Sequence, residues 1–171
     1  PLKNRAFAQG IYAQSATAKE IVGTVKYTKD GRKFVYCKAG EALSAGKVAV
    51  AKAIGASIVN EVIATAIAAG SKTFTLTVTT GTAIDENQFA GGYLQVNDEA
   101  GEGDQYLIES NSEMASSGTT VTISLAEGEV IRTALTTSSE ITLVHPVGYE
   151  VTHEASSLKL PICIPVIDVT D

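Results

Sequence analysis

The chain has 171 residues, of which 44% are hydrophobic and 19% are charged, so it is long enough for one ordinary domain and too apolar to be wholly disordered. Its 13 basic and 19 acidic residues give a formal net charge of −6, which argues against binding to nucleic-acid phosphates or to an anionic membrane surface. Tryptophan is absent and aromatic residues make up 6%, so we expect a core of Val, Ile, Leu and Ala.

Residues 1–22 are rich in Ala and Gln and show neither a helical stripe nor strong alternation. They predict an N-terminal arm that lies on another surface, or a partly disordered leader. The first five residues contain no apolar signal-peptide region, and no apolar run approaches the roughly 20 residues that span a bilayer. We therefore expect a chain that is made in the cytoplasm and not secreted through a signal peptide.

The segments 24–28 and 33–38 predict a β-hairpin, because both are rich in β-branched and aromatic residues. Asp30-Gly31 between them predicts a two-residue turn, since these residues accept the positive φ angles that such turns need.

Residues 41–69 are ambiguous. Their many alanines favour a helix, but Gly46 and Gly55 interrupt the run and residues 47–54 alternate in polarity. We interpret the stretch as strands of small residues, with a helix over 57–69 as the alternative.

From residue 71 onward, alternation of apolar and polar residues predicts a series of short strands. They are expected at 73–79, 93–96, 106–109, 120–125 and 141–144, with a single helical turn at 85–89. Short strands with glycine-containing turns indicate a mainly β protein. We predict a single β-sandwich or barrel-like domain over residues 23–157.

Residues 158–171 form an apolar segment that contains Pro161 and Pro165. Proline is excluded from central strands and tolerated at edges and in extended arms. We expect an extended C-terminal tail, which either covers an edge of its own domain or joins a neighbouring subunit.

No pattern of nucleophile, base and orienting group is visible around His145 and His153, and the sequence lacks a G-x-S-x-G motif. Cys37 and Cys163 can pair, but two cysteines do not make a disulfide framework, and free thiols or small buried side chains are the default interpretation. We expect no catalytic residue, no metal site and no cofactor.

The acidic loop 97–104 carries four carboxylates and two glycines. Such a loop can wrap Ca²⁺, but its spacing does not match an EF-hand. A solvated hairpin loop is the simpler interpretation. Glycoside hydrolysis through Asp98, Glu99, Glu102 or Asp104 is a distant alternative.

Three stretches, residues 36–46, 87–103 and 130–140, resemble a group of tailed-phage structural proteins encoded among the head genes. The family is that of capsid decoration, or cement, proteins. The resemblance implies a virion protein that binds the outer surface of the expanded icosahedral head and clamps neighbouring major capsid subunits. It also implies a homotrimer that is not an enzyme. The alternative is another virion component, such as a head fibre, a neck or tail protein, or a receptor-binding module.

In such a protein, segments 1–22 and 158–169 are the expected contacts with the major capsid protein and with other copies of the chain, since extended segments add strands to partner sheets. The expected interaction residues are Leu2, Lys3, Arg5, Phe7, Ile11, Tyr12, Leu158, Leu160, Ile162, Ile164 and Val166.

Overall fold

A computed structural model describes residues 8–53, 58–78, 83–153 and 161–170. It divides the chain into two compact units. The split unit comprises residues 1–52 and 147–171, and the inserted unit comprises residues 53–146. The two units meet at residues 52/53 and 146/147, whereas the predicted arm, domain and tail meet at residues 22/23 and 157/158. The division into arm, domain and tail stays a prediction.

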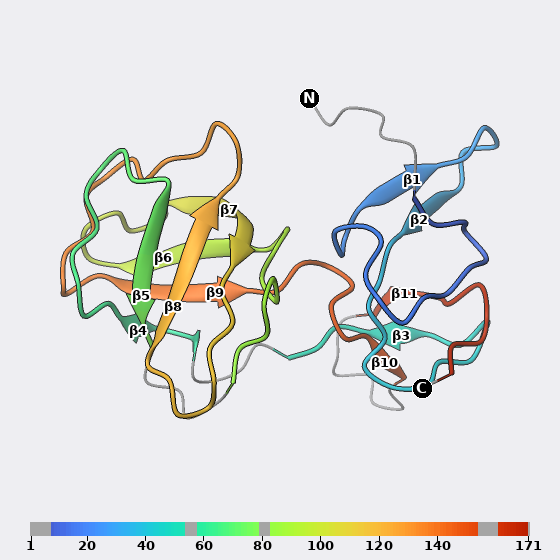
Figure 1. The fold of residues 1–171 in the computed structure, drawn as a ribbon. Coiled ribbons are helices and arrows are strands. Elements are labelled where there is room, and N and C mark those ends of the chain that lie inside the picture. The colour runs from blue at the N-terminus through green and yellow to red at the C-terminus, as the bar shows by residue number, and fades with distance from the viewer. Residues whose placement is uncertain (1–7, 54–57, 79–82, 154–160, 171) are drawn as a thin grey trace. The chain divides into compact units, whose positions relative to one another are not determined.

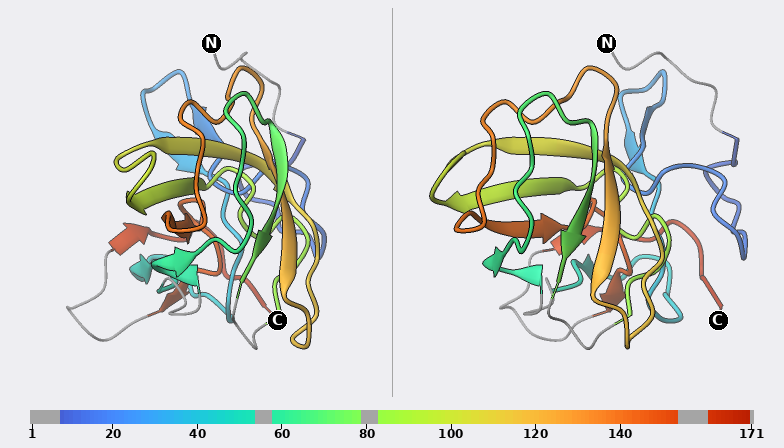
Figure 2. Two further views of the ribbon diagram at one scale, coloured as in Figure 1. Left: turned by 90° about the vertical axis from the view of Figure 1, so that its left-hand side faces the viewer. Right: turned by 60° about the vertical axis from the view of Figure 1, so that its left-hand side comes forward.

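The fold is mainly β, as predicted, and the described residues contain no α-helix (Figure 1). The inserted unit holds one sheet of six strands, in which every neighbouring pair is antiparallel. In spatial order these strands are β4 (Glu61–Val62), β9 (Glu140–Val144), β6 (Tyr93–Asp98), β7 (Gln105–Asn111), β8 (Thr120–Leu125) and β5 (Thr73–Thr77). The sheet is curled into a half-barrel (Figure 2).

The curled sheet encloses an apolar core because several of its strands, namely β5, β6 and β8, alternate between buried and more exposed side chains. In β5, for example, Phe74 and Leu76 are buried while Thr73 and Thr75 are exposed. Twenty buried hydrophobic side chains form a single cluster in this unit. The predicted strands at 73–79, 93–96, 106–109, 120–125 and 141–144 are thus confirmed, with ends that differ by a few residues.

The split unit contains a hairpin and a small sheet. The hairpin joins β1 (Val25–Tyr27) to β2 (Lys33–Val35). The small sheet has the order β10 (Thr152–His153), β3 (Ala49–Val50) and β11 (Pro161–Cys163). Its core consists of Leu43, Ala49 and Val151, with partly buried apolar side chains around them.

The hairpin is where the sequence predicted it, but its loop has three residues. Tyr27 pairs with Lys33, the Thr28 amide donates to the Arg32 carbonyl at 3.0 Å, and the Gly31 amide donates to Thr28 at 3.0 Å. Gly31 alone in this loop has a positive φ, of 85°. This is a β-turn closed by a left-handed glycine, and not the predicted two-residue turn.

Two other local predictions are resolved by the structure. Within 41–69 the described residues form only the two short strands β3 and β4, which agrees with the strand interpretation. The helical turn expected at 85–89 is wrong, since Asn87 has a φ of 59° and is shared by two overlapping β-turns, 85–88 and 87–90.

The described part of the tail pairs within its own unit. Pro161 begins β11, which is an edge strand and therefore tolerates proline. Further on, Val169 and Leu43 exchange two backbone hydrogen bonds of 2.8 and 2.9 Å. These pairings place the described part of the tail on its own unit, and the expected contact with a neighbouring subunit stays a prediction.

Candidate interaction sites

The expected interaction residues of the arm and tail fall into two groups. Leu2, Lys3, Arg5, Phe7, Leu158 and Leu160 lie outside the described residues. Among the others, Ile11 and Ile162 are half-buried, whereas Tyr12, Ile164 and Val166 have exposed fractions of 64%, 58% and 44%.

The described part of the arm is held against the hairpin end through Tyr36. The Lys19 amide donates to the Tyr36 hydroxyl at 3.0 Å, and the Gly23 amide donates to the Tyr36 carbonyl at 2.8 Å. Within the arm, the Ala8 amide donates to the Glu20 carboxylate at 2.6 Å. Tyr12 therefore lies in a segment that is hydrogen-bonded to Tyr36 and within itself.

Further exposed apolar side chains of the split unit were not expected from the sequence. Val25 and Tyr27 project from the same face of β1, because residues two apart in a strand share a face. Their exposed fractions are 39% and 69%. The alternation of residues 24–28 predicts that Val25 and Tyr27 share one face of the strand, but it does not show whether other residues of the protein pack against that face. Ile21, Val48 and Val147 are exposed as well.

A cluster of charges lies where segment 38–40 meets segment 149–151. The Glu150 carboxylate is bound by the ammonium groups of both Lys38, at 2.9 Å, and Lys52. The same two ammonium groups lie 4.7 and 5.4 Å from the centre of the Tyr149 ring, which is within the range of cation–π attraction.

The backbone at this cluster is constrained. Glu150 has a φ of 44°, which is costly for a residue with a side chain and occurs where neighbouring contacts enforce it. Gly40 packs so closely that a Cβ atom there would lie 2.9 Å from the Glu150 carbonyl oxygen. The cluster is thus rigidly placed by the parallel bridge between Ala39 and Val151.

The charges of the cluster change the acidity of its members. Burial by itself raises the pKa of Glu150, but hydrogen bonds from Lys38 and Lys52 outweigh it and lower this pKa to about 2. Burial, together with the nearby Glu150 charge, raises the pKa of Tyr149 to about 12. Glu150 therefore stays ionised and Tyr149 stays neutral over the physiological range.

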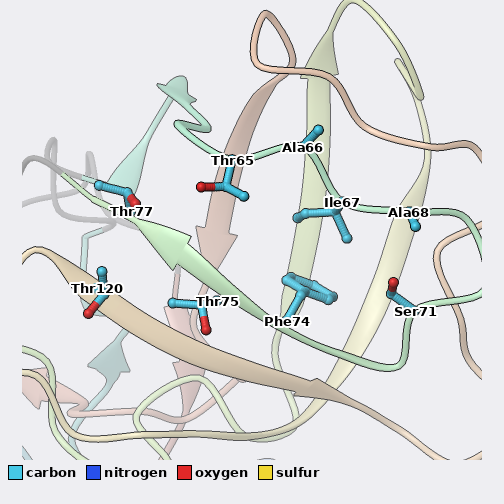
Figure 3. Close-up of a pocket in the computed structure, with 9 residues that line it drawn as sticks. All are labelled: Thr65, Ala66, Ile67, Ala68, Ser71, Phe74, Thr75, Thr77 and Thr120. Carbon is cyan, nitrogen blue, oxygen red and sulfur yellow. The ribbon is translucent and has the colours of Figure 1, made fainter.

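A hollow of about 280 Å³ lies in the inserted unit, between residues 65–68 and the edge strand β5 (Figure 3). Its lining consists of hydroxyl and small or apolar side chains, namely Thr65, Ala66, Ile67, Ala68, Ser71, Phe74, Thr75, Thr77 and Thr120. None of these side chains is charged, so the lining itself offers no charged group to hold an ion.

Two of the four carboxylates of the acidic loop 97–104 accept hydrogen bonds. The Asp98 carboxylate accepts from the Glu99 amide at 2.8 Å, and Asp104 accepts from Arg132 and from the Tyr106 hydroxyl. The Tyr106 and Arg132 contacts hold the pKa of Asp104 below its usual range, which is opposite to what a general acid needs. In the part of the chain that the structure describes, no three His, Cys, Asp or Glu side chains converge to hold a metal ion.

The two histidines take part in packing and in backbone contacts. His145 stacks on Phe89 with ring centres 4.8 Å apart, and His153 Nε2 accepts from the Ser44 amide at 2.6 Å. These contacts give each ring a role in fixing a neighbouring segment.

Comparison with protein-family models, with curated proteins and with solved structures finds no match to this chain. Within the described residues, no helix has the length and apolar character needed to cross a membrane.

Proposed function

We propose that this chain is a virion structural protein of the capsid decoration class. It binds the outer surface of an expanded icosahedral head as a homotrimer and clamps neighbouring major capsid subunits. The proposal starts from the resemblance of residues 36–46, 87–103 and 130–140 to such proteins. The surface of the split unit supports it independently.

The supporting observation is the uneven distribution of exposed apolar side chains. Of the 12 large hydrophobic residues that are exposed among the described residues, eight belong to the split unit. Scattered single apolar residues are ordinary on a protein surface, whereas a concentration of them marks an interaction surface. We assign the capsid-facing role to the split unit, through the exposed face of β1 and the segments around Tyr12 and Ile164.

The charge cluster at Glu150 supplies a complementary polar contact. Lys38 and Lys52 both pair with Glu150, and 44% and 42% of their side chains stay exposed. In the proposed complex they face carboxylates of the shell, which adds specificity and register more than affinity. The same proposal gives a role to the strained backbone of Glu150, the residue that both lysines bind.

The first experiment measures the copy number of the chain in purified particles of the phage that encodes it, by quantitative mass spectrometry against the major capsid protein. A near-stoichiometric ratio is expected for a component of the whole shell. A handful of copies per particle would favour a neck, tail or fibre component, and absence from particles would overturn the virion proposal. Light scattering of the purified chain tests the trimer.

The second experiment locates the binding surface with a matched pair of variants. Tyr27→Ala in the split unit is compared with Tyr93→Ala in the inserted unit, since both side chains are exposed, at 69% and 42%. Co-sedimentation with expanded shells that lack the protein should weaken at least roughly tenfold for Tyr27→Ala, because interface aromatics are frequent hot spots. Equal loss in both variants would contradict the assignment to the split unit.

A further inference from the structure

Cys37 and Cys163 are 126 positions apart in the chain, yet their Sγ atoms lie 3.9 Å apart. Cys37 follows β2 by two residues, and Cys163 is the last residue of β11. Both are free thiols and both are half-buried. Since the sulfurs of a disulfide are about 2 Å apart, they need to approach each other by only about 2 Å more to bond.

Packing holds the two thiols in this position. Both side chains lie against the small core of Leu43, Ala49 and Val151. Gly148 covers Cys37 so closely that a Cβ atom there would lie 2.8 Å from the Cys37 sulfur. The short distance between the two sulfurs is therefore a property of the folded unit.

The two thiols also differ in acidity. A hydrogen bond between the two thiols, in which either sulfur can be the donor, lowers the pKa of Cys163 to about 7. The same hydrogen bond, with burial, raises the pKa of Cys37. A thiolate is the attacking species in exchange, so Cys163 is the better nucleophile of the pair.

We propose that Cys37 and Cys163 form a redox modification site that takes a low-molecular-weight disulfide, such as oxidised glutathione, as its oxidant. The Cys163 thiolate attacks one sulfur of oxidised glutathione, which releases one glutathione thiolate and leaves a mixed disulfide on Cys163. Cys37 then gives up its proton, attacks Cys163 Sγ and releases the second glutathione. The protein loses two hydrogens as the oxidant is reduced to two thiols.

The bond joins the two separate stretches of the split unit, since Cys37 lies in residues 1–52 and Cys163 in residues 147–171. It is expected under oxidising conditions and not in a reducing cytosol. This inference concerns the fold of the unit and does not depend on the proposed capsid role.

The test incubates the full chain with oxidised glutathione, alkylates the remaining thiols, and analyses intact mass and a non-reducing digest. The expected product is a monomer that has lost two hydrogens and yields one linked peptide containing both cysteines. Its thermal midpoint should exceed that of the reduced chain, because a cross-link restricts the unfolded state. The reaction should be roughly tenfold or more faster in the folded chain than in concentrated urea, where a long loop has to close.

The variants Cys37→Ser and Cys163→Ser serve as controls for each other. Each should stop at a stable glutathione adduct on its remaining cysteine, because the second thiol that would release the glutathione is missing. Persistent adducts on both cysteines of the wild type, disulfide-linked dimers, unreacted thiols, or equal rates in folded and unfolded chain would each overturn the proposal.

Discussion

The inserted unit and the split unit are both built from antiparallel strands, but they differ in how much apolar surface they bury. Among the described residues, 21 buried hydrophobic side chains belong to the inserted unit and five to the split unit. The inserted unit can be stabilised by its own core. The split unit depends more on backbone pairing, on the charge cluster at Glu150 and on close glycine contacts, and it leaves more apolar surface for a partner.

A matched pair of core truncations tests this difference most strongly. Leu94 in the inserted unit is 0% exposed and Leu43 in the split unit is 5% exposed. We expect Leu94→Ala to lower the free energy of unfolding by about 4 kcal/mol and Leu43→Ala by about 2 kcal/mol, because a small cluster relaxes around a cavity more easily. Urea denaturation measures both values. Equal losses would show that the split unit has a core as effective as the larger one.

A pair of glycine variants separates packing from backbone strain. Gly148 and Gly31 both have positive φ, of 92° and 85°, but only Gly148 has a neighbour, Cys37 Sγ, within 2.8 Å of an added Cβ. We expect Gly148→Ala to cost about 3 kcal/mol and Gly31→Ala about 1 kcal/mol. Thermal unfolding of the reduced chain checks this ordering, and similar costs would remove the argument for tight packing at Cys37.

The charge cluster predicts a dependence of stability on pH. Because the pKa of Glu150 is lowered from 4.5 to about 2, its contribution is fully present above pH 4.5 and is lost as the pH falls towards about 2. Allowing for solvent screening, we expect Glu150→Gln to cost about 1 kcal/mol at neutral pH, and the difference from the wild type to vanish in acid. Urea denaturation across this range measures the effect, with Glu109→Gln, an exposed partner of Lys72, as the control. A difference that persists in acid would contradict an electrostatic origin.

The smallest expected effect is that of Tyr27→Ala on stability. With 69% of its side chain exposed, Tyr27 should contribute less than about 0.5 kcal/mol to folding. A larger loss in urea denaturation would mean that Tyr27 supports the hairpin, and weakened shell binding by this variant would then have another explanation.

The sequence predicts well those elements whose signal is local. The alternation in 73–77 and 120–125 requires one buried face, and both segments form strands with that face inward. The Asp30-Gly31 dipeptide predicts a hairpin, but it is compatible with loops of two and three residues, so the register was not determined locally.

The parts that were not predicted depend on partners distant in the chain. β3 has only two residues and exists because β10 and β11 pair with it from about a hundred positions away. Lys38 and Glu150 are separated by 112 positions, and the two cysteines by 126. No periodicity within either segment indicates these contacts. The charge cluster was therefore visible only in the structure, and the sequence raised the pairing of the two cysteines as a possibility without deciding it.

The split unit also has a consequence for the order of folding. Its sheet requires β3 to find β10 and β11 across the whole length of the inserted unit, and closing so long a loop is slow. Within the inserted unit, however, β4 pairs with β9, which brings Glu61 beside Ile141. Once that pairing forms, the route from β3 to β10 is greatly shortened. We therefore expect amide protection in kinetic hydrogen-exchange labelling to appear in β4–β9 before it appears in β3, with the inserted unit acting as a nucleus for the rest of the chain.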